Sequence, residues 1–140
     1  MNEDLTTPEL PAGQRAAFEA LLDSERTDTS HRLAGLVRQL DAIVESCALS
    51  VSDDEHDPEG ATLGFERAQV TALVGQARQH LDAIDKALER LGTGTYGVCE
   101  TCGRLIGVER LRVHVVARAC VTCATGAGRG TGRISFRGSG

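Results

Sequence analysis

Apolar residues recur along two stretches of this chain at alternating spacings of three and four residues. The first stretch carries Leu33, Val37, Leu40, Val44 and Cys47, and Phe18 and Leu22 extend its apolar face upstream. The second keeps the pattern without a miss at Val70, Val74, Ala77, Leu81, Ile84, Leu88 and Leu91, with Leu63 one heptad earlier. A period of 3.5 residues places one narrow apolar seam on a helix and is typical of coiled coils. The pattern therefore predicts two long helices.

The link between the two seams is short and acidic. Residues 50–61 read SVSDDEHDPEGA, and the tip includes Asp53, Asp54, Asp57, Glu59 and Ala61. A short link favours an antiparallel hairpin, which we place over residues 15–92. Asp57 and Pro58 also suit an ordinary helix start, because Asp is a favoured N-cap and Pro a favoured first helical residue. The alternative is that the tip carboxylates reach a metal ion or basic groups in a partner's cleft.

The remaining segments differ in composition from the hairpin. Residues 1–14 are polar and contain Pro8 and Pro11, which predicts an irregular N-terminus. Residues 93–125 hold four of the five cysteines, and residues 126–140 form a tail rich in Gly and Arg. Such a tail cannot bury enough apolar area to offset its chain entropy, so we predict that it is disordered.

Composition narrows the fold class. The chain has 140 residues, of which 41% are hydrophobic but only 3% aromatic, with no Trp. Large rings dominate most globular cores, so this balance favours mainly α structure with narrow buried stripes over a β-sandwich or an α/β enzyme core. The N-terminus is acidic, unlike a signal peptide, and no apolar run approaches the roughly 18 residues of a membrane span. These features predict a cytoplasmic protein.

Charge is distributed unevenly along the chain. Residues 1–60 hold fourteen acidic and four basic residues, whereas residues 96–140 hold two acidic residues and seven arginines. The formal net charge of the whole chain is −5. Proteins dedicated to nucleic-acid binding are more often basic overall, so the balance argues against that class for the chain as a whole.

Four cysteines follow the spacing of a metal site. Cys99 and Cys102 are separated by two residues, seventeen residues follow, and Cys120 and Cys123 repeat the pair. This spacing matches sites in which four thiolates hold one Zn²⁺ tetrahedrally, and a site filled by four protein ligands is structural. A redox-active dithiol or unrelated core cysteines are the alternatives. Cys47 lies on the first seam and is expected to be a small buried apolar residue.

An acidic-tipped helical hairpin followed by a four-Cys finger resembles the DksA/TraR family of bacterial transcription regulators. The matching finger positions are Tyr96-Gly97, Cys99, Cys102-Gly103, Ile106, Arg110-Leu111, Cys120 and Cys123, and Asp57-Pro58 matches the tip. The resemblance covers roughly residues 15–125. It implies a non-enzymatic protein that binds RNA polymerase through the secondary channel, with tip acids acting near the catalytic Mg²⁺. It also implies a basic partner-binding surface on the finger at Arg104, Arg110, Arg112 and Arg118.

The chain departs from the family pattern at several positions. Gly60 takes the place of the second tip acid, and Val115 takes the place of a proline. Some family members respond to the alarmone guanosine tetraphosphate through basic residues. The corresponding places are His114, Ala124 and Ala83, which argues against guanosine tetraphosphate as a ligand.

Two other functions stay open on the sequence. The basic finger and tail could bind nucleic acid, for which a steep salt dependence would be diagnostic. Alternatively, a tip acid such as Asp57 or Glu59 could hold a second Mg²⁺ and stimulate transcript cleavage by the polymerase, as Gre-type factors do.

Overall fold

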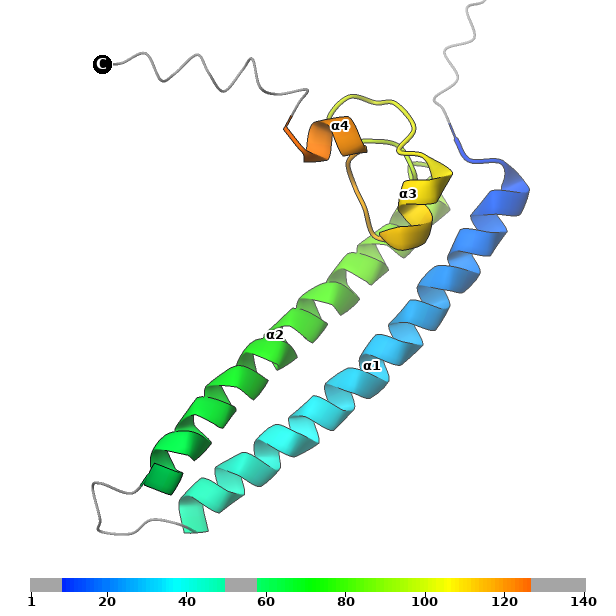
Figure 1. The fold of residues 1–140 in the computed structure, drawn as a ribbon. Coiled ribbons are helices and arrows are strands. Elements are labelled where there is room, and N and C mark those ends of the chain that lie inside the picture. Colours follow the sequence, from blue (N-terminus) through cyan, green and yellow to red (C-terminus); the bar gives the residue numbers. More distant parts are fainter. Residues whose placement is uncertain (1–8, 50–57, 127–140) are drawn as a thin grey trace, which may run out of the picture. The chain divides into compact units, whose positions relative to one another are not determined.

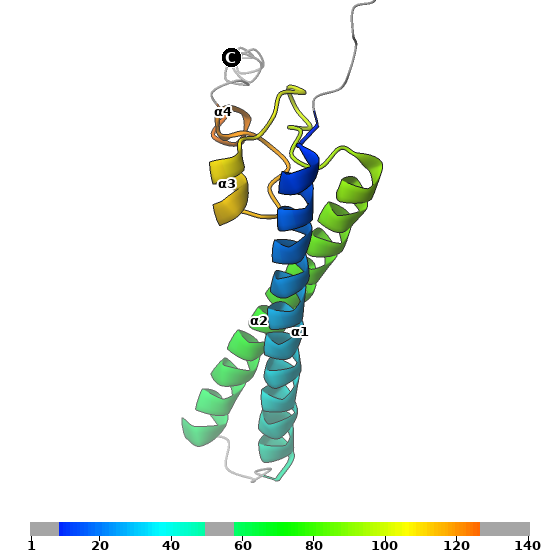
Figure 2. The ribbon, with the colours of Figure 1, turned by 90° about the vertical axis from the view of Figure 1, so that its right-hand side faces the viewer.

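The computed structural model describes residues 9–49 and 58–126, with side chains from residue 61 onward in the second range (Figure 1). The helices in this part of the chain are α1 (Ala12–Leu49), α2 (Pro58–Thr93), α3 (Val108–Val113) and α4 (Val121–Ala124). Backbone pairing between strands is limited, in the described residues, to one isolated antiparallel bridge between Val98 and Leu105. The mainly α fold predicted from the sequence is therefore confirmed, with two long helices running in opposite directions (Figures 1 and 2).

The helix ends follow from proline and glycine. α1 begins three residues before the predicted position, and the carbonyl of Pro11 accepts its first hydrogen bond from the amide of Arg15 at 2.9 Å. α2 begins at Pro58, where a fixed φ favours a first helical residue and the missing N–H costs nothing. After α2, Gly94 adopts a φ of +82°, which glycine tolerates without strain.

The chain divides into two compact units that both draw on α1 and α2. One unit takes in Met1–Asp23 and Ile84–Gly140, which we call the base unit. The other is Ser24–Ala83, which we call the hairpin arm. The finger residues thus share a unit with the start of α1 and the end of α2, a division that differs from the predicted boundary at residue 93.

The hairpin arm has a small aliphatic core. Ile43, Val70 and Val74 are buried, and Leu33, Leu36, Val37, Leu40, Cys47 and Leu63 pack against them. The seam predicted on α2 is confirmed. On α1, however, the side chain of Val44 is 40% exposed and Ile43 is buried in its place. Ile43 continues a seven-residue series with Leu22, Thr29 and Leu36. The predicted positions Leu33, Val37, Leu40 and Cys47 do pack in this core, so the prediction is wrong at Val44 alone.

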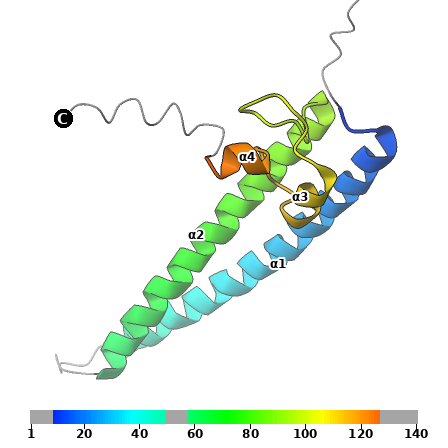
Figure 3. The same cartoon turned by 45° about the horizontal axis from the view of Figure 1, so that its top comes forward.

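The base unit has a second, separate core. It joins Phe18 and Leu22 of α1 to Ile84, Ala87 and Leu91 of α2, and it includes the finger residues Tyr96, Cys99, Ile106, Leu111 and Cys123. The rings of Phe18 and Tyr96 lie 5.7 Å apart, tilted by 50°. α3 and α4 lie beside the helix ends in all three ribbon views (Figures 1, 2 and 3). The finger therefore packs on the helices instead of enclosing a core of its own.

Neither long helix is apolar enough over a sufficient length to cross a membrane, and the same holds for the short helices among the described residues.

Thr29 interrupts the apolar seam of α1 in the hairpin arm. Its side chain is 0% exposed, and its hydroxyl oxygen has no hydrogen-bond partner among the described residues. In the same arm, Glu25 and His80 join the two helices through a hydrogen bond of 2.9 Å between Oε1 and Nε2. A buried hydroxyl without a partner costs free energy, because it has given up water without replacement.

Replacing Thr29 by Val should therefore stabilise the protein. Thr29→Val keeps the branched shape and removes the unsatisfied hydroxyl, so we expect the free energy of unfolding to rise by about 1–2 kcal/mol. Thermal and urea unfolding followed by circular dichroism measure this change. Thr71→Val is the matched control, because Thr71 is exposed on α2 and its substitution should change stability by less than about 0.5 kcal/mol. A destabilised Thr29→Val protein would contradict the cost assigned to the unsatisfied hydroxyl.

Candidate metal centre

The four paired cysteines converge in the base unit. Their sulfur atoms all lie within 4.8 Å of one another, and the Sγ atoms of Cys102 and Cys120 are 3.9 Å apart. A zinc ion with four Zn–S bonds of about 2.3 Å requires S···S edges of about 3.8 Å, so the cluster has nearly the size that the ion demands. Four thiols also form the donor set that zinc prefers in closed structural sites. The predicted cysteine set therefore fits one structural Zn²⁺.

A tight backbone turn positions the first pair. The amide of Cys99 donates to the carbonyl of Arg104 at 2.7 Å, and the amide of Gly103 donates back to the carbonyl of Cys99 at 2.9 Å. Gly103 has a φ of +77°, in the left-handed region that glycine adopts without strain. This turn brings Cys99 and Cys102 to one side, as two ligands of one ion require.

The second pair sits at the start of α4. Cys120 precedes the helix with an extended backbone, and Cys123 lies within its single turn. The amide of Ala124 donates to the carbonyl of Cys120 at 2.8 Å, which closes that turn. The two halves of the finger are joined where the amide of Glu100 donates to the carbonyl of Arg118 at 2.9 Å.

The thiols of the cluster differ in their acidity. Burial opposes ionisation of Cys99, but backbone hydrogen bonds from Cys102, Cys120 and Thr101 lower its pKa to about 6. Burial raises the pKa of Cys123 to about 12, and its hydrogen bonds to neighbouring cysteines act in the same direction. Cys99 therefore ionises before Cys123 as the pH rises. Zinc binds thiolates, so loading the site displaces the remaining thiol protons.

Tyr96 links the finger to the helices, a role that the sequence did not reveal beyond its place in the family motif. Its hydroxyl donates to the carbonyl of Val115 at 2.6 Å, while its ring packs near Phe18 of α1. Next to it, Gly97 has a φ of +86°, and a Cβ built there would lie 3.2 Å from Leu10. The N-terminal residue Leu10 is buried against this turn, although we predicted an irregular segment there.

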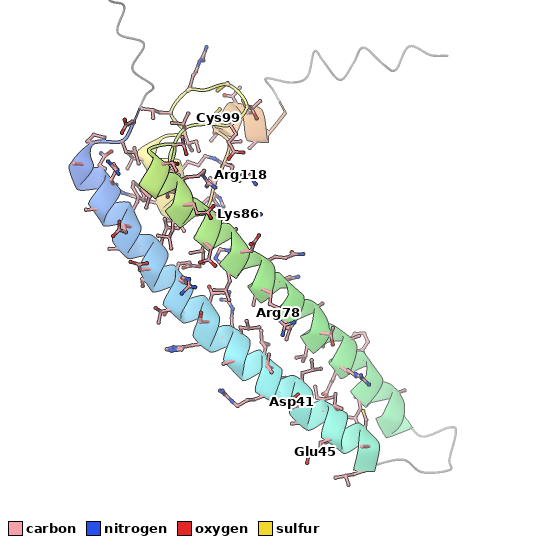
Figure 4. All side chains as sticks on the ribbon, turned by 180° about the vertical axis from the view of Figure 1, so that it is seen from behind. Asp41, Glu45, Arg78, Lys86, Cys99 and Arg118 are labelled. Atoms are coloured by element: carbon pink, nitrogen blue, oxygen red, sulfur yellow. The ribbon has the colours of Figure 1, made fainter. Side chains whose placement is uncertain are left out.

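The predicted basic surface of the finger is partly used within the fold. Nε of Arg110 donates to the carbonyl of Ala119 at 2.9 Å. Arg118 donates from Nε and Nη2 to the carboxylate of Glu100 at 2.8–3.0 Å, and this interaction lowers the pKa of Glu100 (Figure 4). Arg104 and Arg112 are exposed. Of the four predicted arginines, two are therefore committed to holding the finger loops.

The predicted tip falls largely outside the described part of the chain. Asp53, Asp54 and Asp57 lie outside the described residues, and Glu59 is described only as part of the backbone of α2. Ala61 is exposed in the first turns of α2. The tip assignment therefore stays a prediction.

Substitution of single cysteines should separate the metal site from the fifth cysteine. We expect wild-type protein to carry one zinc ion per chain and Cys102→Ser to lose it, because three thiolates and a hydroxyl bind zinc far less tightly. Cys47→Ser is the matched control, because Cys47 packs in the core of the hairpin arm. Zinc released on unfolding, measured with a colorimetric chelator, gives the content. Equal zinc loss in both variants would rule out this assignment.

The single tyrosine should titrate abnormally late. Burial raises the pKa of Tyr96 to about 12, with Arg90 acting in the opposite direction. Because the folded pKa lies above the unfolded value of about 10, the stabilisation is fully present below pH 10 and is lost as the pH rises toward 12. Absorbance of tyrosinate at 295 nm should therefore rise well above pH 10 in folded protein and near pH 10 in denaturant. A rise near pH 10 in both would contradict the burial of the hydroxyl.

Comparison with known proteins identifies a zinc-finger family in the C-terminal part of the chain. The model of the "Prokaryotic dksA/traR C4-type zinc finger" matches residues 94–127, which include all four clustered cysteines. The chain is 32% identical over 105 residues to General stress protein 16O of Bacillus subtilis, covering 74% of this chain and 61% of that protein. It is 35% identical over 48 residues to the RNA polymerase-binding transcription factor DksA of Escherichia coli, covering 34% and 32% respectively. The chain thus spans less than two thirds of the length of these relatives.

The fold as a whole has a counterpart among solved structures. The transcription factor DksA2 from Pseudomonas aeruginosa superposes with a TM-score of 0.71 and 24% identity, covering 97% of this chain and 95% of that one. This likeness shows a shared fold, whereas the family-specific signal lies in the finger motif. Residues 94–127 therefore form a zinc finger of the DksA/TraR C4 type, and the clustered cysteines within it fit one structural zinc ion as cofactor.

Proposed function

We propose that this protein regulates transcription by binding RNA polymerase, without catalysing a reaction itself. In this proposal the hairpin enters the secondary channel of the polymerase in the cytoplasm, and the acidic tip over residues 50–61 acts near the catalytic Mg²⁺. Cys99, Cys102, Cys120 and Cys123 hold the zinc ion, and the exposed finger arginines Arg104 and Arg112 contribute to the partner surface.

The observation that carries the proposal is the way the finger is built onto the hairpin. The finger, with its four cysteines, shares one apolar core with the start of α1 and the end of α2. This is the combination of parts shared with DksA2. The DksA proteins among the relatives are named as RNA polymerase-binding transcription factors. A hairpin held in this way suits a protein that inserts its distal end into a partner.

The chemistry of the hairpin end supports the same role. α1 ends at Leu49 and α2 begins at Pro58, so the acidic residues of the link lie between two helix ends. Carboxylates crowded into a short link repel one another, and a neutral turn would close a hairpin as well. Gly60 lacks the second acid of the family pattern, which leaves Asp57 and Glu59 as the residues through which the tip would act.

The structure does not favour nucleic-acid binding by the finger. Arg110 and Arg118 already donate to Ala119 and Glu100, which leaves Arg104 and Arg112 as the exposed pair from the predicted set. Guanosine tetraphosphate is also a poor fit for the corresponding family positions, because Ala83 and Ala124 offer no cation for its phosphates. The proposal therefore takes RNA polymerase as the partner, and nucleic-acid binding by the basic finger and tail stays the alternative.

A tip variant with a matched control tests the proposal. Asp57→Ala/Glu59→Ala removes two carboxylates from the tip, and Asp41→Ala/Glu45→Ala removes two exposed carboxylates from α1 (Figure 4). Both variants should bind core RNA polymerase from the same organism with an affinity within a few fold of wild type. The tip variant should lose most of its effect on open-complex lifetime and initiation, whereas the α1 variant should retain it.

Three results would decide against parts of the proposal. Wild-type protein that fails to bind core polymerase at low salt rules out the polymerase as partner. A tip variant as active as wild type rules out the acidic tip as the working end. Cleavage of transcripts in stalled complexes that depends on Asp57 or Glu59 would replace the proposed regulator with a stimulator of cleavage.

A further inference from the structure

The surface of the base unit contains an open hollow between the start of α1 and the end of α2. It has a volume of about 320 Å³ and is lined by Ala12, Arg15, Ala16, Glu19, Leu88, Leu91 and Gly92. The two alanines and the glycine leave the space open, while Leu88 and Leu91 form an apolar floor. Arg15 reaches across it, because its Nη2 donates to the carbonyl of Leu91 at 3.1 Å.

Three acidic residues lie in or near the lining of this hollow, which also contains Arg15. Glu19 belongs to the lining, and Asp85 and Glu89 lie three residues before Leu88 and Gly92, which places them on the same side of α2. An apolar floor with an acidic rim fits a segment that combines large apolar residues with arginines. Leu88 packs against the core but is only partly buried, so an added apolar group would cover the part of its side chain that is now exposed.

The C-terminal segment of this chain has that composition. Residues 127–140 contain three arginines and no acidic residue, and their large apolar residues are Ile134 and Phe136. These two are separated by one residue and flanked by Arg133 and Arg137. In an extended segment, residues two apart point to the same side. Ile134 and Phe136 can therefore face one apolar floor together, with the flanking arginines near its rim.

The segment follows directly on the finger, in the same unit as the hollow. Cys123 belongs to the apolar cluster that includes Leu88 and Leu91, and the segment follows Gly126, three residues after Cys123. Phe136 is ten residues beyond Gly126, a span of up to roughly 35 Å for an extended chain. The reach is therefore sufficient within one compact unit.

We propose that residues 133–137 of the C-terminal segment dock into this hollow of the base unit, with Ile134 and Phe136 on Leu88 and Leu91 and the arginines beside Glu19 and Glu89. The segment lacks enough apolar area to form a core of its own, but it can extend a core that already exists. Docking would cover the junction of α1 and α2 next to the finger. The inference is independent of the proposed polymerase binding.

Nuclear magnetic resonance on the full zinc-loaded chain tests the docking directly. We expect nuclear Overhauser contacts between the Phe136 ring and the Leu88 methyl groups. Removal of residues 127–140 should shift the Leu88 and Leu91 methyl resonances and speed amide exchange at residues 88–92 at least about threefold. Ile134→Ser/Phe136→Ser should reproduce both effects, whereas Thr131→Ser/Ser139→Ala should produce neither.

A substitution on the other side of the contact provides an independent check. Ala16 is exposed, so Ala16→Lys should leave the fold intact while it fills the hollow and repels the arginines. We expect this variant to lose the contacts of the Phe136 ring. Unchanged Leu88 and Leu91 resonances on removal of the segment would overturn the proposal. Contacts found only between differently labelled chains would overturn it as well, because the segment would then come from a second copy.

Discussion

The fold of the base unit depends on the cluster formed by the sulfur atoms of four cysteines. Residues between Gly94 and Gly126 contain two very short helices and one isolated bridge, which is too little regular structure to hold a fold on its own. A tetrahedral metal site closes this segment at Cys99, Cys102, Cys120 and Cys123. Once closed, the segment presents Tyr96, Ile106 and Leu111 to the ends of α1 and α2. The metal therefore organises a core that the finger shares with the ends of α1 and α2.

The two cores are stabilised by different interactions. The core of the base unit is supported by the metal site, by the bond from Tyr96 to Val115 and by the ion pair of Arg118 with Glu100. The core of the hairpin arm rests on three buried aliphatic side chains and their neighbours, and the arm also contains the buried Thr29. An arm with a small core has less stability to spare, and such regions open more readily than a large core.

The sequence was sufficient for features that repeat or follow fixed spacing. The period of the second seam, the helix start at Pro58 and the left-handed Gly103 all agree with what the residues predict locally. The buried side of α1 was not predictable in this way, because two series fit equally well beside Leu33 and Leu40. One series contains Val37 and Val44, and the other contains Leu36 and Ile43. The correct choice depends on Leu22 and Thr29, one or more turns away, which continue the series of Leu36 and Ile43.

Functional surfaces were harder to predict than the metal site, for a physical reason. Metal ligands are specified by residue type and spacing, whereas a surface arginine is available to a partner only if nothing nearby accepts its hydrogen bonds. The fold brings the carbonyl of Ala119 within reach of Arg110 and the carboxylate of Glu100 within reach of Arg118. Arg104 and Arg112 are exposed instead. Glu100 follows Cys99 and Ala119 precedes Cys120, so both acceptors lie next to metal ligands. The availability of Arg110 and Arg118 therefore depends on the folded finger, which residue type and spacing alone do not specify.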